Sequence, residues 1–247
     1  MATYYAKRAL EILREEGPVE SAKASKNFLY NRRIFIKFKQ WWKYSRHYEA
    51  SLDPFHILWI DPNRIYQRNK SVITKSERNL SHVIGGEWDQ EHHPFEERML
   101  YKSMESHFID GIDWKQTELY NQVVKGDRYW RGISSESEFG ERCQYLDNLY
   151  DTINSEGYKT YQQIHGKKPK TPREIKVKIS RNGDFFYLNG KHRLSIAKIL
   201  GIETVPVNVI VRHKKWQELR DQIHNNGLPE GREDLINHPD LQDILKV

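Results

Sequence analysis

The sequence of 247 residues has almost no cysteine and no long apolar run. Its single cysteine, Cys143, has no partner in the chain, which excludes an internal disulfide and a zinc site built from several thiolates. No segment approaches the ~20 apolar residues of a membrane-spanning helix, and the chain does not open with the apolar stretch of a signal peptide. We therefore expect a cytoplasmic protein.

Apolar residues are also scarce, at 37% of the chain, but aromatic residues compensate. Seven Trp, fourteen Tyr and nine Phe can bury large areas, so we expect a folded protein. The length suits one domain of ordinary size with an appendage, which can bury a core without disulfides or metals.

Positive charge is concentrated near the N-terminus. Residues 1–50 hold 11 Lys/Arg and 5 Asp/Glu, a difference of +6, which leaves 29 of each in residues 51–247. A DNA-binding domain normally carries its basic surface on the module that reads the DNA. This distribution therefore argues against nucleic acid as the main partner.

Residues 1–50 are predicted to form a basic, amphipathic helical extension. A short helix is expected over residues 3–16, and residues 19–48 then alternate cations with apolar side chains, among them Trp41 and Trp42. Such a helix can cap the domain, bind in the groove of a partner protein, or hold the protein peripherally on an anionic membrane. All three interpretations stay open at this point.

The rest of the chain predicts an α+β fold, a small mixed sheet with flanking helices. The main domain is expected over residues 51–225, with a helical insertion at about 70–140 and a polar tail at 226–247. Short β-rich runs, helical periodicity and glycine stops give the elements. The expected strands are 55–60, 174–180, 185–188 and 204–212. The expected helices are two over 94–125 broken at 111–113, then 138–155, 194–200 and 216–223. Asn182-Gly183 is expected as a two-residue hairpin turn.

The most informative segment is Asn189-Gly190-Lys191-His192-Arg193, hereafter the box, between a predicted strand and a predicted helix. A helix start presents unpaired N–H groups and a positive dipole end, to which the box adds cationic donors. We expect an anion to bind there, with Gly190 allowing a close backbone approach and Ser195 adding a hydroxyl. An alternative stays open, in which Asn189-Gly190 is a turn, His192 bonds a local carbonyl and Arg193 forms a surface ion pair.

The order of elements around the box resembles the ParB/sulfiredoxin superfamily. In that superfamily a helix, a hairpin and a Gly-x-[His/Arg]-Arg box are followed by a helix, Leu-Gly and a Val-Pro-Val strand. Here the corresponding segments are 146–157, 175–179, 190–193, 200–201 and 205–207. The resemblance covers about seventy residues, 142–212.

The resemblance implies that the box binds the phosphates of ATP, ADP or CTP. Sulfiredoxins have a catalytic cysteine where this chain has Lys191, and little chain remains after Arg212 for the DNA-reading helices of partition proteins. The box is nearer to that of the free-serine kinases. We therefore expect a kinase-like phosphotransferase or a nucleotide hydrolase with a small hydroxylated acceptor. The alternative is a non-enzymatic module in which the nucleotide switches binding to DNA, a protein or a membrane surface.

Phosphoryl transfer also needs a carboxylate, which orients the acceptor hydroxyl or holds Mg²⁺ through water. Glu87 and Asp89 lie in a predicted loop with two glycines and several acids, and we expect the catalytic carboxylate there. The adjacent His92 and His93 do not share a helical face, so no metal site of the protein's own is expected.

Two arginines that follow the first predicted strand are further candidates. Arg64 and Arg68 resemble the arginines of a polar turn in the superfamily, which implies contacts to phosphate.

Overall fold

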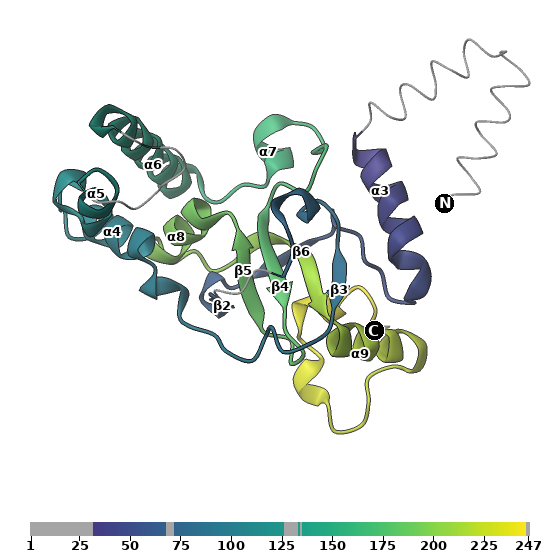
Figure 1. Ribbon diagram of the computed structural model, residues 1–247. Helices are drawn as coiled ribbons and strands as arrows, with labels where there is room; N and C mark the ends of the chain where they lie inside the picture. The colour runs from purple at the N-terminus through teal and green to yellow at the C-terminus, as the bar shows by residue number, and fades with distance from the viewer. Residues whose placement is uncertain (1–31, 68–71, 126–132, 134, 246–247) are drawn as a thin grey trace, which may run out of the picture.

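The computed structural model describes residues 32–67, 72–125, 133 and 135–245 (Figure 1). The protein has a mixed α/β fold in which helices surround a six-stranded mixed sheet. No helix within the described ranges is long and apolar enough to cross a membrane. The helices expected before residue 32 lie outside the described residues.

Strand β6 organises the sheet. The strand order is β1-β6-β4-β5-β2, and β3 also pairs with β6. β4 runs parallel to β6, whereas β1 pairs with the first half of β6 and β3 with its last residues. The strands are β1 (Ile57–Ile60), β2 (Ile65–Tyr66), β3 (His82–Ile84), β4 (Ile175–Ile179), β5 (Phe185–Asn189) and β6 (Val205–His213).

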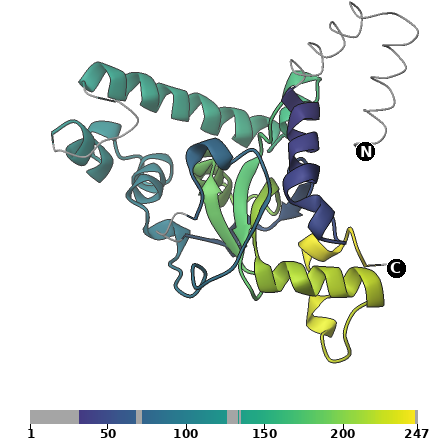
Figure 2. The same ribbon diagram turned by 45° about the vertical axis from the view of Figure 1, so that its right-hand side comes forward.

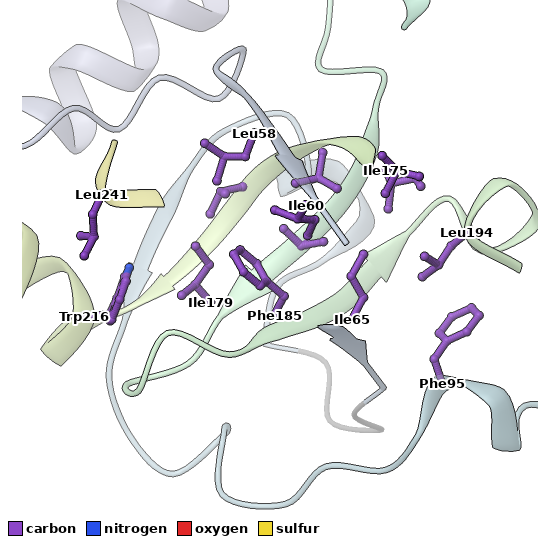
Figure 3. Packing of buried hydrophobic residues seen from close by; sticks show 14 of the residues in the cluster. Leu58, Ile60, Ile65, Phe95, Ile175, Ile179, Phe185, Leu194, Trp216 and Leu241 are labelled. Atoms are coloured by element: carbon purple, nitrogen blue, oxygen red, sulfur yellow. The ribbon is translucent and has the colours of Figure 1, made fainter. Parts of the chain in front are cut away.

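One face of the sheet carries the main hydrophobic core (Figure 3). Side chains from the strands, such as Ile60, Ile179 and Phe185, pack with Leu194 of helix α8 (Lys191–Ile199) and Trp216 of helix α9 (Lys214–Asn226). Trp216 has no exposed surface. Burying its indole contributes on the order of 3 kcal/mol to stability.

The second face of the sheet is also covered, which differs from the expectation for the hairpin. Alternation in β4 predicted one buried face and one exposed face, but all five of its residues are buried. Ile73 and Trp88, from the segment between β2 and helix α4, pack over this second face. Lys176 and Lys178 are therefore buried beneath that segment.

The helices of the expected insertion pack around a second hydrophobic cluster, which lies to one side of the sheet. The long helix in Figure 2 is α6. Gly111, with a φ of +70°, separates α4 from α5, as predicted. Ser135 and Glu138 form a capping box at the start of α6, and Gly157 ends that helix. The bounds are α4 (Met99–Phe108), α5 (Glu118–Val123), α6 (Glu136–Glu156) and the short α7 (Tyr161–His165).

Two local predictions are corrected. The hairpin loop has three residues rather than two, because Ser180 N–H donates to Asp184 O at 2.9 Å and Gly183 takes a φ of +94°. Helix α8 begins at Lys191, three residues earlier than expected, so the last three residues of the box form its first turn.

The C-terminal segment is more than a polar tail. Leu235, Leu241 and Ile244 belong to the main core. The segment contains two 3-10 turns, Glu233–Leu235 and Pro239–Leu241, and the second carries the buried Asp240. The segment closes the same side of the sheet as α9 (Figure 1).

Candidate functional site

The box links β5 to α8. Gly190 is the residue before the helix and has a φ of +95°, a conformation that favours glycine. A Cβ atom at this position would lie 3.2 Å from the Cα of Ile175 in the neighbouring strand. The close approach of β4 therefore fixes glycine here, and it brings the start of β4 next to the first turn of α8.

Arg193 is held at the start of β4. Its Nη2 donates to the carbonyl oxygen of Arg173 at 2.6 Å, and its Nη1 lies 3.6 Å from Oε2 of Glu174. The Glu174 side chain is only 2% exposed, and its Oε1 accepts a hydrogen bond from Tyr161 N–H at 2.8 Å. Burial raises the pKa of Glu174, although the Tyr161 hydrogen bond and the charge of Arg193 oppose this shift. Arg193 thus forms an ion pair with a buried carboxylate, whereas the alternative interpretation expected an ion pair at the surface.

Lys176 lies opposite Asn189 in the β4–β5 register, and hence beside the box. Its Nζ donates to the carbonyl oxygen of Arg78 at 2.6 Å and to Oδ1 of Asn79 at 3.3 Å. Burial and, to a smaller extent, the positive charges of Arg173, Arg78 and Arg193 together lower the pKa of Lys176 to about 8. These four cations, Arg78, Arg173, Lys176 and Arg193, are called the cationic cluster below.

Two polar atoms at the cluster lack a hydrogen-bond partner. Nε of Arg78 and Oε2 of Glu174 are both buried and form no hydrogen bond with the described residues, although Oε2 faces Arg193 Nη1 at 3.6 Å. Folded proteins leave few buried polar atoms unsatisfied, and such atoms commonly bond water, an ion or a ligand. The start of α8 therefore combines concentrated positive charge with unused hydrogen-bonding capacity.

The other predicted residues of the box differ in exposure. Asn189, Lys191 and Arg193 are partly exposed, whereas His192 is buried, with its ring edge-on to Tyr145 of α6 at 6.4 Å between centroids. Ser195 is fully buried within the packing of α8. The structure thus places the accessible part of the predicted site at Asn189, Lys191 and Arg193.

Glu87 and Asp89 are not brought together with the box. Asp89 accepts hydrogen bonds from Arg181 N–H, Nε and Nη2 at 2.8–3.2 Å, and its side chain is 1% exposed. Glu87 is 73% exposed and lies 3.1 Å from Arg181 Nη2. Arg181 is in the hairpin loop before β5, whereas Gly190 follows β5, so a strand of roughly 17 Å separates them. Asp89 instead anchors its loop to the hairpin.

Of the two other predicted arginines, Arg64 lies away from the box. The guanidinium of Arg64 lies 5.8 Å from the ring of Phe185, at the hairpin end of β5. Arg68 lies outside the described residues. Within the described ranges, no group of three or more His, Cys, Asp or Glu side chains could hold a metal ion, and this includes the surroundings of His92 and His93.

Arg78, Arg173, Glu174 and Lys176 were missed as site residues in the sequence. The sequence did contain a signal for Glu174 and Lys176. Both lie at the start of the predicted strand 174–180, which the predicted hairpin pairs with the residues just before the box. Arg78 has no such signal, since it comes from the polar stretch before β3.

Comparisons with protein-family models, with curated proteins and with solved structures find no match to this chain. The resemblance to the ParB/sulfiredoxin superfamily therefore stays a prediction.

Proposed function

We propose that the protein binds the phosphate groups of a nucleotide at the start of α8. The observation that carries this proposal is the geometry of the cationic cluster beside the box. The buried Lys176 lies opposite Asn189 and donates to the carbonyl oxygen of Arg78, while Arg193 donates to that of Arg173, each at 2.6 Å. Glu174 balances part of this charge. Like charges gathered in a poorly solvated place repel one another, so a bound anion of two or more charges would stabilise the cluster.

A phosphate group fits this chemistry better than a single carboxylate. It carries up to two charges and three acceptor oxygens, which match guanidinium and ammonium donors and the N–H groups of a helix start. The resemblance of the segment around the box to the ParB/sulfiredoxin superfamily implies that the nucleotide is ATP, ADP or CTP, with Mg²⁺ bound through the nucleotide. Asn189, Gly190, Lys191 and Arg193 would then contact the phosphates.

For an enzymatic role, we propose Glu174 in place of Glu87 and Asp89 as the carboxylate at the site. Phosphoryl transfer depends mainly on positioning and charge neutralisation, helped by a carboxylate that orients the attacking hydroxyl. Glu174 contacts Arg193, and its raised pKa suits a general base. The acceptor would be a small hydroxylated molecule, or water in a hydrolase.

A non-enzymatic switch is the second candidate. Glu174 joins Arg193 to the backbone of Tyr161, so a phosphate that bound Arg193 would compete with a link between α8 and α7. Phosphate release from ATP and CTP with Mg²⁺, with and without a mixture of hydroxylated acceptors, separates the two candidates. Turnover favours the enzyme, and binding without turnover favours the switch.

Replacing Lys176 with methionine is expected to weaken ATP binding at least about tenfold, because a cation in a poorly solvated site is lost. Lys178→Met is the matched control. Lys178 is also buried on the same face of β4, but it lies two residues farther from the box, with its Nζ 5.3 Å from the Trp88 ring centre. Calorimetric titration of both variants and the wild type with ATP, ADP and CTP, with and without Mg²⁺, measures the effect. Equal affinity in the wild type and Lys176→Met would refute the assignment.

Nucleotide affinity is expected to fall above pH 8. The lowered pKa of Lys176 leaves its amine increasingly neutral as the pH rises past about 8, and the anion then loses one attractive charge. In the absence of nucleotide, the effect of rising pH on stability is opposite to its effect on nucleotide affinity. The folded protein binds fewer protons at Lys176 than the unfolded chain between pH 8 and about 10.4, so this residue's contribution to the free energy of unfolding rises there. Titrations between about pH 7.5 and 9.5, where the ammonium form of Lys176 is lost, should show this decline in the wild type but not in Lys176→Met.

A further inference from the structure

Helix α3 (Arg32–Lys43) packs on the domain through one face. Ile36 is buried with Phe55 and Leu80. The buried side chain of Gln40 forms two hydrogen bonds with the backbone of Ser81. Gln40 Nε2 donates to the Ser81 carbonyl oxygen at 3.0 Å, and the Ser81 N–H donates to Gln40 Oε1 at 2.8 Å. These contacts fix the rotation of the helix and so determine which side chains point away from the domain.

The opposite face of α3 is exposed and combines aromatic with basic side chains. Phe35 is 40% exposed and Trp42 is 56% exposed. Lys39 lies between these two aromatic residues, and Lys43 and Arg46 follow Trp42. The guanidinium of Arg46 lies 4.8 Å from the Trp42 ring centre. The surface, called the α3 face below, consists of Phe35, Lys39, Trp42, Lys43 and Arg46, all of them exposed.

This arrangement argues against one of the three sequence interpretations, the one in which Trp42 packs on the domain as part of a capping helix. A helix that only caps the domain would turn its large apolar side chains inward, as α3 does with Ile36. Trp42 instead points its ring toward solvent, with cations at its border. Tryptophan flanked by Lys and Arg is typical of side chains at a lipid–water interface.

More positive charge lies next to the first turn of α3. Arg33 Nη1 donates to the carbonyl oxygen of Pro169 at 3.0 Å, which places the loop after α7 beside the helix. That loop exposes Lys167, Lys168 and Lys170. Two segments far apart in the sequence thus contribute cations to this side of the molecule, and α3 lies on the side of the sheet away from α4 and α5 (Figure 2).

We propose that the α3 face docks the protein on an anionic lipid surface. The cations match the negative headgroups, and Phe35 and Trp42 enter the interfacial region. The exposed aromatics favour lipid over nucleic acid, because they are spaced along one helix face at positions that suit a flat interface. This function is independent of nucleotide binding at α8.

The test uses the full-length protein and vesicles of phosphatidylcholine with or without about 30% phosphatidylserine, which sets the anionic surface charge. We expect flotation with the anionic vesicles at low salt and release at high salt. The triple variant Lys39→Glu, Lys43→Glu, Arg46→Glu should lower the partition coefficient at least about a hundredfold, since each cation contributes separately. A control with the same change in net charge is Lys102→Glu, Lys214→Glu, Lys215→Glu, which alters exposed residues elsewhere.

Trp42→Ala tests the aromatic contribution without a charge change. Because Trp42 is mostly exposed, the melting temperature should not change, whereas vesicle binding should fall about tenfold. Trp59→Ala is the matched control, since Trp59 is 47% exposed on β1. The proposal is wrong if the wild type does not float with anionic vesicles, or if the triple variant and its control lose binding equally. It is also wrong if a single-stranded oligonucleotide binds the α3 face more tightly than the vesicles and displaces them, which would identify nucleic acid as the partner.

Discussion

Replacing Asp240 with alanine is expected to lower the free energy of unfolding by about 3–5 kcal/mol, the usual cost of removing one partner from a buried ion pair. Asp240 accepts hydrogen bonds from Arg212 Nε and Nη2 at 2.9 and 2.5 Å and from Trp216 Nε1 at 2.9 Å, and it lies 3.3 Å from Arg220 Nη1. All four side chains are buried. The variant would leave two arginines without this carboxylate in the core.

Asp243→Ala is the control for this prediction, because Asp243 forms an ion pair with Arg220 and its side chain is 21% exposed. Its loss should cost about 1 kcal/mol. Urea denaturation of both variants measures the difference, and equal losses would contradict the central role of Asp240. Burial would raise the pKa of Asp240, but the charges of Arg212 and Arg220 hold it well below its usual range. The resulting stabilisation is present above the unfolded carboxyl pKa of about 4 and is lost as the pH falls below it.

Replacing Gly190 with alanine is expected to abolish nucleotide binding at the box and to destabilise the fold by about 2–4 kcal/mol. The positive φ of Gly190 strains any residue with a Cβ, and that Cβ would press on the backbone of Ile175 at 3.2 Å. The helix start must then shift relative to β4. Such a shift separates Lys191 and Arg193 from Lys176, and the cationic cluster loses its geometry.

Gly201→Ala is the control variant, because it introduces the backbone strain of a positive φ without the steric contact that a Cβ meets at position 190. Gly201 follows the same helix and has a φ of +63°, but a Cβ there would meet nothing within 4 Å. We expect a cost of about 1 kcal/mol and unchanged ATP affinity. Thermal melting and calorimetric titration give both quantities for each variant. If Gly190→Ala binds ATP like the wild type, the start of α8 is not where the phosphates bind.

Local signals in the sequence predicted much of the fold. The periodicity of α6, the alternation in β4 and the apolar run of β6 depend on neighbouring residues, and each element was found within a few residues of its predicted bounds. The glycines at 111, 157 and 183 mark conformations with positive φ that any chain would need there. These predictions required no knowledge of tertiary contacts.

The features that were missed depend on distant parts of the chain. β3 has three residues and forms because β6 offers it an edge, while Lys176 and Lys178 are buried because residues 72–95 cross the second face of the sheet. The expected catalytic loop is the same segment, and its Asp89 is used to hold that crossing in place through Arg181. Composition indicated a polar, acidic loop, but it could not indicate to which end of β5 the loop would attach.

The pairing of β6 with early strands sets an order of folding during synthesis. Ile60 pairs with Val205, so the first strand must wait for 145 further residues before its partner exists. Helices α4–α6 lie within that interval, and every buried residue of their shared hydrophobic cluster except Ile196 comes from residues 100–153, so we expect them to form first on the ribosome. Strands β1 and β3 meanwhile expose unpaired edges, which makes the nascent chain prone to aggregation until β6 emerges.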